Sequence, residues 1–187
     1  MATKKSAKTK TLGKVLSSKI AFSSRVFDVR RELVAEPHGV KAVRDFIEHP
    51  GSVVVLPVFP DGRILLIRQY RHSAGQFLWE LVAGRRDGNE TFARGAHREL
   101  QEETGYTART MRKLIGVYPS PGFLREKMVI FLAQGLRAGP ANPEVDEKIA
   151  ARIFSLREAL DWIRSGKIHD GKTVAGILYY ARFILKK

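Results

Sequence analysis

Three glutamates lie within five residues of one another in a chain that is otherwise strongly basic. Glu99, Glu102 and Glu103 fall in the stretch "ARGAHRELQEETGY", whereas the whole chain carries a formal net charge of +14. On a helix, residues three and four apart share a side, so these three carboxylates would point the same way. Like charges held so close repel and raise one another's pKa. A divalent cation turns that repulsion into coordination, and carboxylates with water suit Mg²⁺ or Mn²⁺.

The segment around these acids has the pattern of a helix. Residues 91–104 are predicted to be helical, with Gly105 as the C-cap. Arg98 can reach Glu102 at position i+4 and steady part of the cluster. On the opposite side, we expect a small apolar stripe formed by Ala93, Ala96 and Leu100. Taken alone, such a run of acids is also typical of a solvated helix face.

The wider pattern is more specific than the acids by themselves. At fixed spacing it contains Gly84, Glu90, Arg98, Glu99, Leu100, Glu102, Glu103, Gly105 and Tyr106. This set resembles the Nudix box of Nudix hydrolases, and the one departure is Tyr106, where the pattern has a bulky aliphatic residue. The resemblance implies an α+β fold, the Nudix α/β/α sandwich with a mixed sheet. It also implies Mg²⁺-dependent attack of water on a diphosphate that is linked to another group.

The same resemblance implies roles for the box residues. Glu99 and Glu103 would be the main metal ligands, with Glu102 close behind. The backbone carbonyl of Ala83, just before Gly84, would complete the metal site. The supporting roles fall to Glu90, which would brace the loop or bind metal through water, and to Arg98, which would orient the carboxylates. The chemistry fits, because cleaving an anionic diphosphate needs charge neutralisation and an oriented water.

The likeness extends beyond the box. The segments "RQYR", "WE" and "AG" that lead into the box, and "YPSPGFLREKMVIFLA" after it, resemble the ADP-sugar branch of the family, the ADP-ribose pyrophosphatases. Pro121 stands fifteen residues after Tyr106, as a proline does in that branch. The resemblance covers roughly residues 24–185.

An ADP-ribose ligand gives several residues a chemical role. Arg68 and Arg71 can contact phosphates or stack on a base, although a surface arginine pair is an alternative for Arg68. Glu80 offers a polar contact at the end of a strand, and Glu126 can bind ribose hydroxyls or bridge to metal. The aromatic residues that could flank adenine, or else pack in the core or at its rim, are Trp79 and Phe123.

The general base is predicted to come from a loop beyond the box. In families that resemble this branch, a glutamate on such a loop often activates the water. The stretch "NPEVDEKIA" offers Glu144 and Glu147, and both are candidates. Glu147 is favoured because it lies nearer the start of the next predicted strand. A solvated loop residue is the alternative for whichever of the two is not used.

The elements that must position these residues follow from hydrophobic periodicity. Strands are predicted within 14–37, 39–51, 52–59, 63–71, 76–83, 109–122, 127–136 and 148–156, and helices at 157–166 and 173–185. The strands at 52–59 and 63–71 flank "PDG" and are predicted to form a hairpin, the first of them buried on both faces. Strands and helices do not alternate regularly, which favours an α+β fold with a mixed sheet.

The N-terminus is predicted to stand apart from the catalytic region. Residues 1–13 are rich in lysine and are expected to be a disordered tail that contacts nucleic acid only weakly. Residues 14–50 are rich in strand signal and are expected to form an arm. In the branch that the chain resembles, such strands commonly cross to a second subunit, which implies a homodimer. Residues 51–187 would then form the catalytic domain.

Composition narrows the class of protein further. The chain has 187 residues and no cysteine, so disulfides and cysteine-based catalysis or metal sites are excluded. Its longest apolar runs are too short to cross a membrane, and the first residues lack the apolar core of a secretory signal. We expect a cytosolic protein. The positive net charge favours anionic ligands.

Three functional hypotheses follow. The first is hydrolysis of ADP-ribose to AMP and ribose 5-phosphate. The second keeps the chemistry but changes the substrate to GDP-mannose or another nucleoside diphosphate sugar. The third is a Nudix-fold protein without catalysis that binds nucleic acid or acts as a regulator. The intact Glu99, Glu102 and Glu103 argue against the third hypothesis, because such a binder has no need of them.

Overall fold

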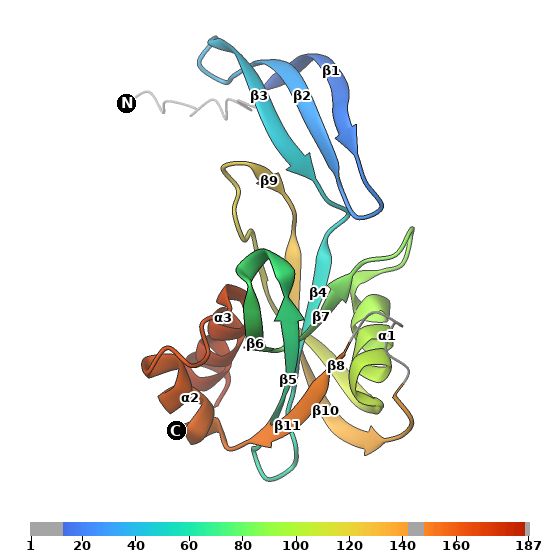
Figure 1. The fold of residues 1–187 in the computed structure, drawn as a ribbon, viewed down its shortest axis with the longest axis vertical. Coiled ribbons are helices and arrows are strands. Elements are labelled where there is room, and N and C mark those ends of the chain that lie inside the picture. Colours follow the sequence, from blue (N-terminus) through green and yellow to red (C-terminus); the bar gives the residue numbers. More distant parts are fainter. Residues whose placement is uncertain (1–12, 142–147, 186–187) are drawn as a thin grey trace, which may run out of the picture. The chain divides into compact units, whose positions relative to one another are not determined.

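The computed structural model describes residues 13–141 and 148–185. The chain divides into two compact units (Figure 1). The first unit contains residues 1–49 and 120–125, and the second contains residues 50–119 and 126–187. Most of the predicted basic tail lies outside the described residues.

The first unit is an antiparallel meander. Its strands are β1 (Lys14–Ser23), β2 (Asp28–Ala35) and β3 (Lys41–Glu48), and the short β9 (Leu124–Arg125) pairs in parallel with β3. In the turn between β1 and β2, the Ser24 hydroxyl accepts the backbone N–H of Phe27 at 3.0 Å. The strand pattern predicted for residues 14–37 and 39–51 is confirmed by these three long strands.

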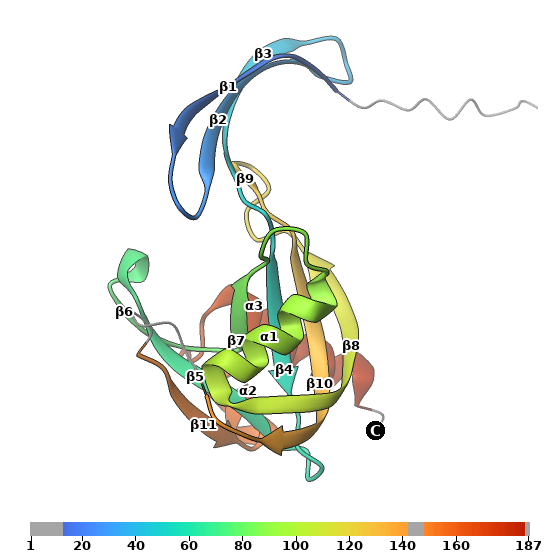
Figure 2. The same ribbon diagram turned by 90° about the vertical axis from the view of Figure 1, so that its right-hand side faces the viewer.

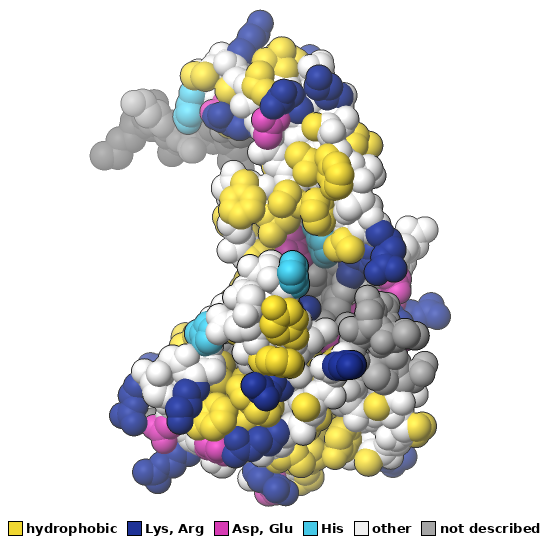
Figure 3. All heavy atoms as spheres, viewed as in Figure 1, with side chains coloured by type: hydrophobic (Ala, Val, Ile, Leu, Met, Phe, Trp, Pro, Cys, Tyr) yellow, Lys and Arg dark blue, Asp and Glu magenta, His cyan; other side chains and the backbone are white. Residues whose placement is uncertain are grey.

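The first unit leaves much apolar surface in contact with solvent. Strand β1 is exposed along its whole length. Hydrophobic side chains gather on the visible face of this unit (Figure 3). The large apolar residues exposed on its strands are Val15, Leu16, Ile20, Phe22, Leu33 and Val43. A surface of this kind, on strands that cover no core of their own, is typical of an interaction site.

The second unit is a sandwich of two sheets with helices on both sides. Its elements are β4 (Ser52–Pro57), β5 (Ile64–Arg71), β6 (Gln76–Glu80), β7 (Val82–Arg85), α1 (Phe92–Thr104), β8 (Tyr106–Val117), β10 (Met128–Ala138), β11 (Ala150–Phe154), α2 (Leu156–Arg164) and α3 (Gly171–Tyr179). One sheet has the order β7-β4-β10-β8 and the other β11-β5-β6. Helix α1 crosses in front of the first sheet, while α2 and α3 lie behind it (Figure 2). Strands β4 and β10 pair in parallel and their neighbours are antiparallel, so the predicted mixed sheet is confirmed.

Strand β4 lies at the centre of this unit. All six of its residues are buried, as the unbroken apolar run predicted. Its side chains point alternately into two hydrophobic cores. Val54 and Leu56 join the core that α2 and α3 cover, and Val53 and Val55 join the core beneath α1. The strand therefore fixes α1 to the same sheet that carries β7.

The predicted hairpin at "PDG" is present only at its turn. Phe59 donates to the Arg63 carbonyl at 2.9 Å, and Val58 and Ile64 form a single antiparallel bridge. Beyond that bridge the two strands separate, because β4 pairs with β7 and β10 whereas β5 pairs with β6 and β11. The hairpin prediction is therefore wrong for the strands themselves. The choice of partner depends on residues far away in the chain, which the local pattern does not contain.

The single strand predicted at residues 76–83 is two strands in different sheets. They meet at Leu81, which is fully buried between β6 and β7. The backbone N–H of Leu81 donates to the Thr173 hydroxyl at 2.8 Å instead of joining a ladder. This break lets one short sequence supply an edge to each sheet.

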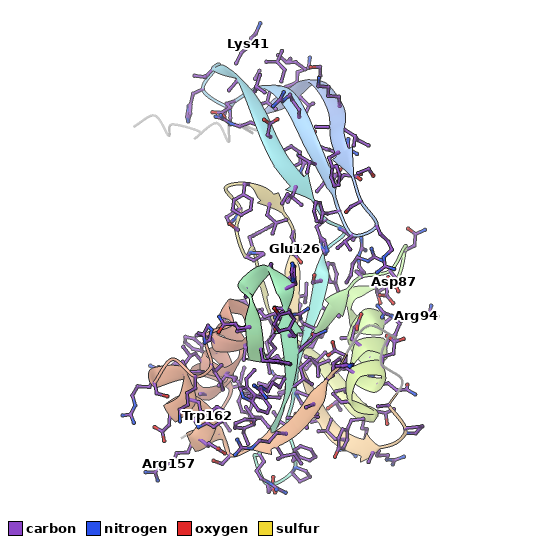
Figure 4. All side chains as sticks on the ribbon, viewed as in Figure 1. Lys41, Asp87, Arg94, Glu126, Arg157 and Trp162 are labelled. Carbon is purple, nitrogen blue, oxygen red and sulfur yellow. The ribbon has the colours of Figure 1, made fainter. Side chains whose placement is uncertain are left out.

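Two helices close the chain. Ser155 caps α2 by accepting the N–H of Glu158, and Asp170 caps α3 by accepting the N–H of Thr173. The helix predicted at 173–185 begins two residues earlier and ends in a π-helical turn at Tyr180–Ile184. Trp162 of α2, labelled in Figure 4, stacks edge-on with Phe154 at 5.1 Å, and Phe154 does the same with Trp79. Trp79 is thus part of a packed aromatic cluster.

Candidate active site

Helix α1 has well-defined ends. Thr91 accepts the N–H of Arg94 at 3.3 Å and caps the start. Gly105 ends the helix in the left-handed conformation, with φ of 72°, and donates to the Gln101 carbonyl. A side chain at Gly105 would also overlap the Gly139 carbonyl. The helix and C-cap predicted from the sequence are confirmed.

The carboxylates of α1 lie on its buried side. Glu99 and Glu103 are buried together with Ala96 and Leu100, whereas Ala93 is exposed. The prediction that the apolar stripe lies opposite the acids is therefore wrong. The four buried residues are spaced at i, i+3, i+4 and i+7, which is a single helical stripe. Apolar packing therefore presses the two carboxylates against the strands rather than holding them in solvent.

The two carboxylates contact neighbouring residues of β7: Glu103 lies at Ala83, and Glu99 lies at Gly84. The Ala83 N–H donates to Glu103 Oε2 at 3.3 Å. A Cβ at Gly84 would overlap the carboxylate of Glu99, so only glycine fits there. The position of Gly84 at the start of the box thus has a steric explanation. It leaves room for the carboxylate of Glu99, fifteen residues later in the chain.

Arg98 holds the remaining acids of the box together. Its guanidinium donates to Glu99 and Glu102, each at 2.8 Å, and to Glu90 at 2.8 Å. The hydrogen bond to Glu90, together with the nearby carboxylate charges, raises the pKa of Arg98 above its ordinary value. The same bond lowers the pKa of the Glu90 carboxyl. The predicted contact between Arg98 and Glu102 is confirmed.

Glu90 also braces the loop before the helix. It accepts the backbone N–H of Asp87 at 2.8 Å, and its own N–H donates to the Asp87 carbonyl at 2.9 Å. Its carboxylate lies over Gly95, where a Cβ would come within 2.7 Å of Oε1. Arg98 further donates to the Arg85 carbonyl at 3.0 Å. The loop and the helix are therefore one hydrogen-bonded piece (Asp87 and Arg94 are labelled in Figure 4).

The chemistry of these donors fits a hard divalent cation. Carboxylate and carbonyl oxygens are the ligands that Mg²⁺ prefers, and Glu99, Glu102 and Glu103 supply carboxylates beside the Ala83 backbone. Within residues 13–141 and 148–185, no three acidic or histidine side chains converge into a ready-made cation cage. Arg98 already occupies oxygens of Glu99 and Glu102. A cation at these oxygens would have to compete with the guanidinium.

A second cluster of charged residues surrounds Glu80. The carboxylate of Glu80 is fully buried and accepts two hydrogen bonds from Arg71, each at 2.8 Å. Lys172, from the start of α3, makes a further ion pair with Glu80 Oε2. Burial alone would raise the pKa of Glu80, but Arg71 and Lys172 outweigh it and hold that pKa below its ordinary value. Glu80 lies at the end of β6 as predicted, and it is a buried, ion-paired acid rather than a surface one.

Arg71 lies within electrostatic reach of the box. Its pKa is raised chiefly by the hydrogen bond to Glu80, and the charges of Glu103 and Asp170 add to the shift. About a third of its side chain is exposed. The structure thus places a fixed, partly exposed cation near the carboxylates of α1. Such a cation suits an anionic phosphate.

The other predicted substrate residues lie in different settings. Arg68 is exposed and stacks on Phe77, with 4.6 Å between its guanidinium carbon and the ring centroid. Glu126 begins the run into β10, is buried, and accepts the hydroxyl of Ser52 (Figure 4). Phe123 belongs to the first unit and is exposed. Glu144 and Glu147 lie outside the described residues.

Sequence reasoning missed the partners of Glu80. Lys172, and its neighbours Asp170 and Thr173 in the stretch "HDGKTV", received no role from the sequence. The spacing of Asp170 and Thr173 is a helix-capping signal that could have placed α3 two residues earlier. Nothing local could have shown that Lys172 faces Glu80, because these two residues lie 92 positions apart.

Comparison with known proteins decides the family. The NUDIX domain model matches residues 48–175, which include the box, Arg71, Glu80 and Glu126. The chain belongs to the Nudix hydrolase family. Within that family it is 36% identical over 168 residues to "ADP-ribose pyrophosphatase" of Bacillus subtilis (strain 168), covering 89% of this chain and 91% of the relative.

Two further proteins are similar to this chain. "GDP-mannose pyrophosphatase" of Citrobacter koseri is 34% identical over 139 residues, 69% of this chain and 72% of the relative. A solved structure, "Crystal structure of ADP compounds hydrolase", has a TM-score of 0.79 at 22% identity, covering 92% of this chain and 94% of the other. This last likeness confirms the Nudix fold. Nudix hydrolases generally need a divalent metal. No helix in the described ranges is long and apolar enough to span a bilayer.

Proposed function

We propose that this Nudix hydrolase cleaves the diphosphate of a nucleoside diphosphate sugar, with ADP-ribose as the substrate and AMP and ribose 5-phosphate as products. The observation that carries the proposal is that carboxylates and an arginine occur together in the second unit, with the charge of Glu103 acting on Arg71. Acids of α1 lie against β7, and Arg71 of β5 lies within their electrostatic reach. Acids suit the metal and the arginine suits the phosphates. The name of the Bacillus relative supports ADP-ribose.

In this proposal each residue has a defined task. Glu99, Glu102, Glu103 and the Ala83 carbonyl would hold Mg²⁺ or, alternatively, Mn²⁺. When bound, the metal would neutralise the diphosphate and lower the pKa of a coordinated water. Arg98 keeps the carboxylates of Glu99 and Glu102 in place through its two hydrogen bonds.

Three further residues would act on the substrate. Arg71 would bind a phosphate, held by Glu80 in a fixed orientation. Arg68 would supply a second cation or a stacking surface at the exposed end of β5. Glu126 would contact the ribose or bridge to metal, which requires a change from its present bond to Ser52. The base remains predicted to be Glu147 or Glu144.

A substrate panel tests this proposal directly. Purified protein is incubated with Mg²⁺ and ADP-ribose, GDP-mannose or a nucleoside triphosphate, and products are separated by ion exchange. ADP-ribose is expected to give the highest kcat/KM, with AMP as product. Preference for GDP-mannose would instead select the alternative that the Citrobacter relative supports. Binding of nucleic acid at physiological salt, without any hydrolysis, would favour the non-catalytic reading.

We further propose that the protein is a cytosolic homodimer joined through the first unit. The exposed apolar residues of β1 and β3 in that unit support the proposal. Light scattering of the full chain would give the mass in solution. A Val43→Lys variant should lower that mass to one chain of 21.0 kDa. A wild-type protein that is monomeric at micromolar concentration would contradict the dimer.

A further inference from the structure

A buried carboxylate, that of Glu80 at the end of β6, is paired with Lys172 at the start of α3. Glu80 is not among the candidate metal ligands. Glu80 has no exposed side-chain surface. A buried charge is costly unless it is paired and hydrogen-bonded. Here two cations from different elements meet it, Arg71 from the end of β5 and Lys172 from α3. Such an arrangement fixes the relative positions of the charged groups, and removing one partner leaves a buried charge uncompensated.

Arg71 owes its orientation to Glu80. Both hydrogen bonds run from one guanidinium to the two oxygens of one carboxylate, which fixes the plane of the guanidinium as well as its position. Glu80 is held in turn by Lys172, whose side chain is 11% exposed and which also contacts Asp170 at 3.0 Å. Arg71 is the most exposed of these four side chains. It is therefore the member able to meet a ligand.

The far end of this chain of contacts is anchored to the fold. Asp170 accepts both the N–H and the hydroxyl of Thr173, at 3.0 and 2.6 Å. The same hydroxyl accepts the N–H of Leu81, the residue that joins β6 to β7. The first turn of α3 thus holds Lys172 at a set distance from the strand that carries Glu80.

We propose that Lys172 is a positioning residue for the hydrolase, acting through Glu80 to keep Arg71 oriented and available for the substrate's diphosphate. The inference rests on the proposed function in assigning Arg71 to a phosphate. Its basis is charge balance. Arg71, Lys172, Glu80 and Asp170 carry two positive and two negative charges, so the cluster is neutral. Without Lys172, Arg71 faces two carboxylates by itself and its charge is less available to an anion.

The first test compares Lys172→Met with wild type. The variant is expected to raise KM by about tenfold, the size of one charge-assisted hydrogen bond, with kcat changed less than about twofold. Lys113→Met is the matched control, because it removes one positive charge from exposed β8 of the same unit. Its KM should equal that of wild type. Equal KM values for Lys172→Met and wild type would overturn the proposal.

A conservative replacement separates positioning from folding. Lys172 lines a cavity of about 350 Å³ together with Tyr118, Pro119, Met128 and Ala175, so a longer side chain has space. Lys172→Arg should return KM to within about threefold of wild type, because Glu80 keeps a second cation. If Lys172→Arg and Lys172→Met are equally impaired, the cation is not what positions Arg71. Thermal unfolding of each variant shows that the fold is retained.

A double-mutant cycle asks whether Lys172 acts through Arg71. In an Arg71→Met background, the added Lys172→Met change should alter KM by less than about twofold, because the group it positions is gone. Independent effects that multiply would show that Lys172 acts elsewhere and would overturn the proposal. The cycle uses whichever substrate the wild type hydrolyses best.

A measurement that needs no substrate hydrolysis tests the role of Lys172 separately from the proposed function. The Nε–H of Arg71 gives an NMR signal, assigned by its loss in Arg71→Met, that is protected from exchange while Glu80 accepts it. Lys172→Met should shift this signal, because Glu80 loses its second cation, and Lys113→Met should not. An unchanged signal overturns the positioning role even if substrates are hydrolysed. Failure of the wild type on every substrate, with the signal behaving as expected, would overturn only the proposed function.

Discussion

The two buried groups of acids in the second unit differ in their balance of charge. Around Arg98, four carboxylates share one guanidinium, those of Asp87, Glu90, Glu99 and Glu102, and Glu103 lies on the buried face of the same helix. Around Glu80, two carboxylates are matched by two cations. An excess of negative charge on a packed helix face is costly until a cation arrives. A cluster whose charges already balance does not need a bound ion. The first cluster is the one that we propose binds a metal, and the second is the one that we propose positions a side chain.

The largest effect is expected from reducing the negative excess at α1. Glu103→Gln keeps the shape of the side chain but removes one charge beside Ala83. Because catalytic metals contribute several kcal/mol to transition-state stabilisation, kcat/KM should fall by about 10³-fold or more. Initial rates across a Mg²⁺ titration measure this. Near-normal activity at limiting Mg²⁺ would show that Glu103 does not hold the metal.

The next largest effect is expected from removing the general base. One of Glu147→Gln and Glu144→Gln should lower kcat by about 10²–10⁴-fold with little change in KM, and Glu147 is favoured. The other variant serves as the control, since it should behave as a solvated residue. Rates at saturating ADP-ribose and Mg²⁺ decide between them. Full activity in both would move the search for the base to Glu126 or to a glutamate of the box.

A change on β7 tests the metal site without altering any charge. Gly84→Ala puts a methyl group where the Glu99 carboxylate now lies. A displacement of about 1 Å at such a group can cost about 10²-fold in rate. We expect that loss in kcat/KM and a weaker apparent affinity for Mg²⁺. Gly116→Ala on β8 is the control for an added methyl, because its φ is not positive and its Cβ would make only ordinary contacts with Lys127 and Met128, at 3.6 and 3.7 Å. Equal losses in the two variants would remove the steric argument.

A change in the balanced cluster around Glu80 should alter the free energy of unfolding rather than the affinity for metal. The pKa of Glu80 is held below its ordinary value of 4.5. A lowered acid pKa gives stability that is complete above the ordinary value and is lost as pH falls through the folded-state value. Glu80→Gln should therefore lower the free energy of unfolding by about 3 kcal/mol at pH 7, with the gap closing below about pH 4. Urea unfolding across pH measures the gap, and a gap that widens on acidification would contradict this assignment.

The smallest effect is expected from the tail. Removing residues 1–13 should leave hydrolysis unchanged, because those lysines have no strand or helix pattern and no acid among them. Any weak affinity for nucleic acid should fall, and more so at low salt. Gel shifts and rates on the truncated chain check both. A large fall in ADP-ribose turnover would give the tail a role in catalysis.

What could be predicted from the sequence was local. The ends of α1, the buried run of β4 and the pairing of Arg98 with Glu102 all follow from residues a few positions apart. The mixed sheet was predicted but the strand pairing was not, because β4 and β5 adjoin in sequence yet belong to different sheets, β4 with β7 and β10 and β5 with β6 and β11. The stripe of α1 was misjudged because the apolar residues were placed opposite the acids, whereas Glu99 and Glu103 are buried beside Ala96 and Leu100. In the structure, Gly84 makes room for Glu99 on the buried side.

The bond from Leu81 to Thr173 has a consequence for the synthesis of the chain. Residue 81 leaves the ribosome 92 residues before its partner, as Glu80 does before Lys172. Contacts of such long sequence separation form late, and domains emerge N-terminal end first. Every box residue is therefore exposed to the cell before α3 can fix the junction of β6 and β7. A nascent chain that stops short of α3 carries the whole motif and lacks the anchor that assembles Arg71 beside it.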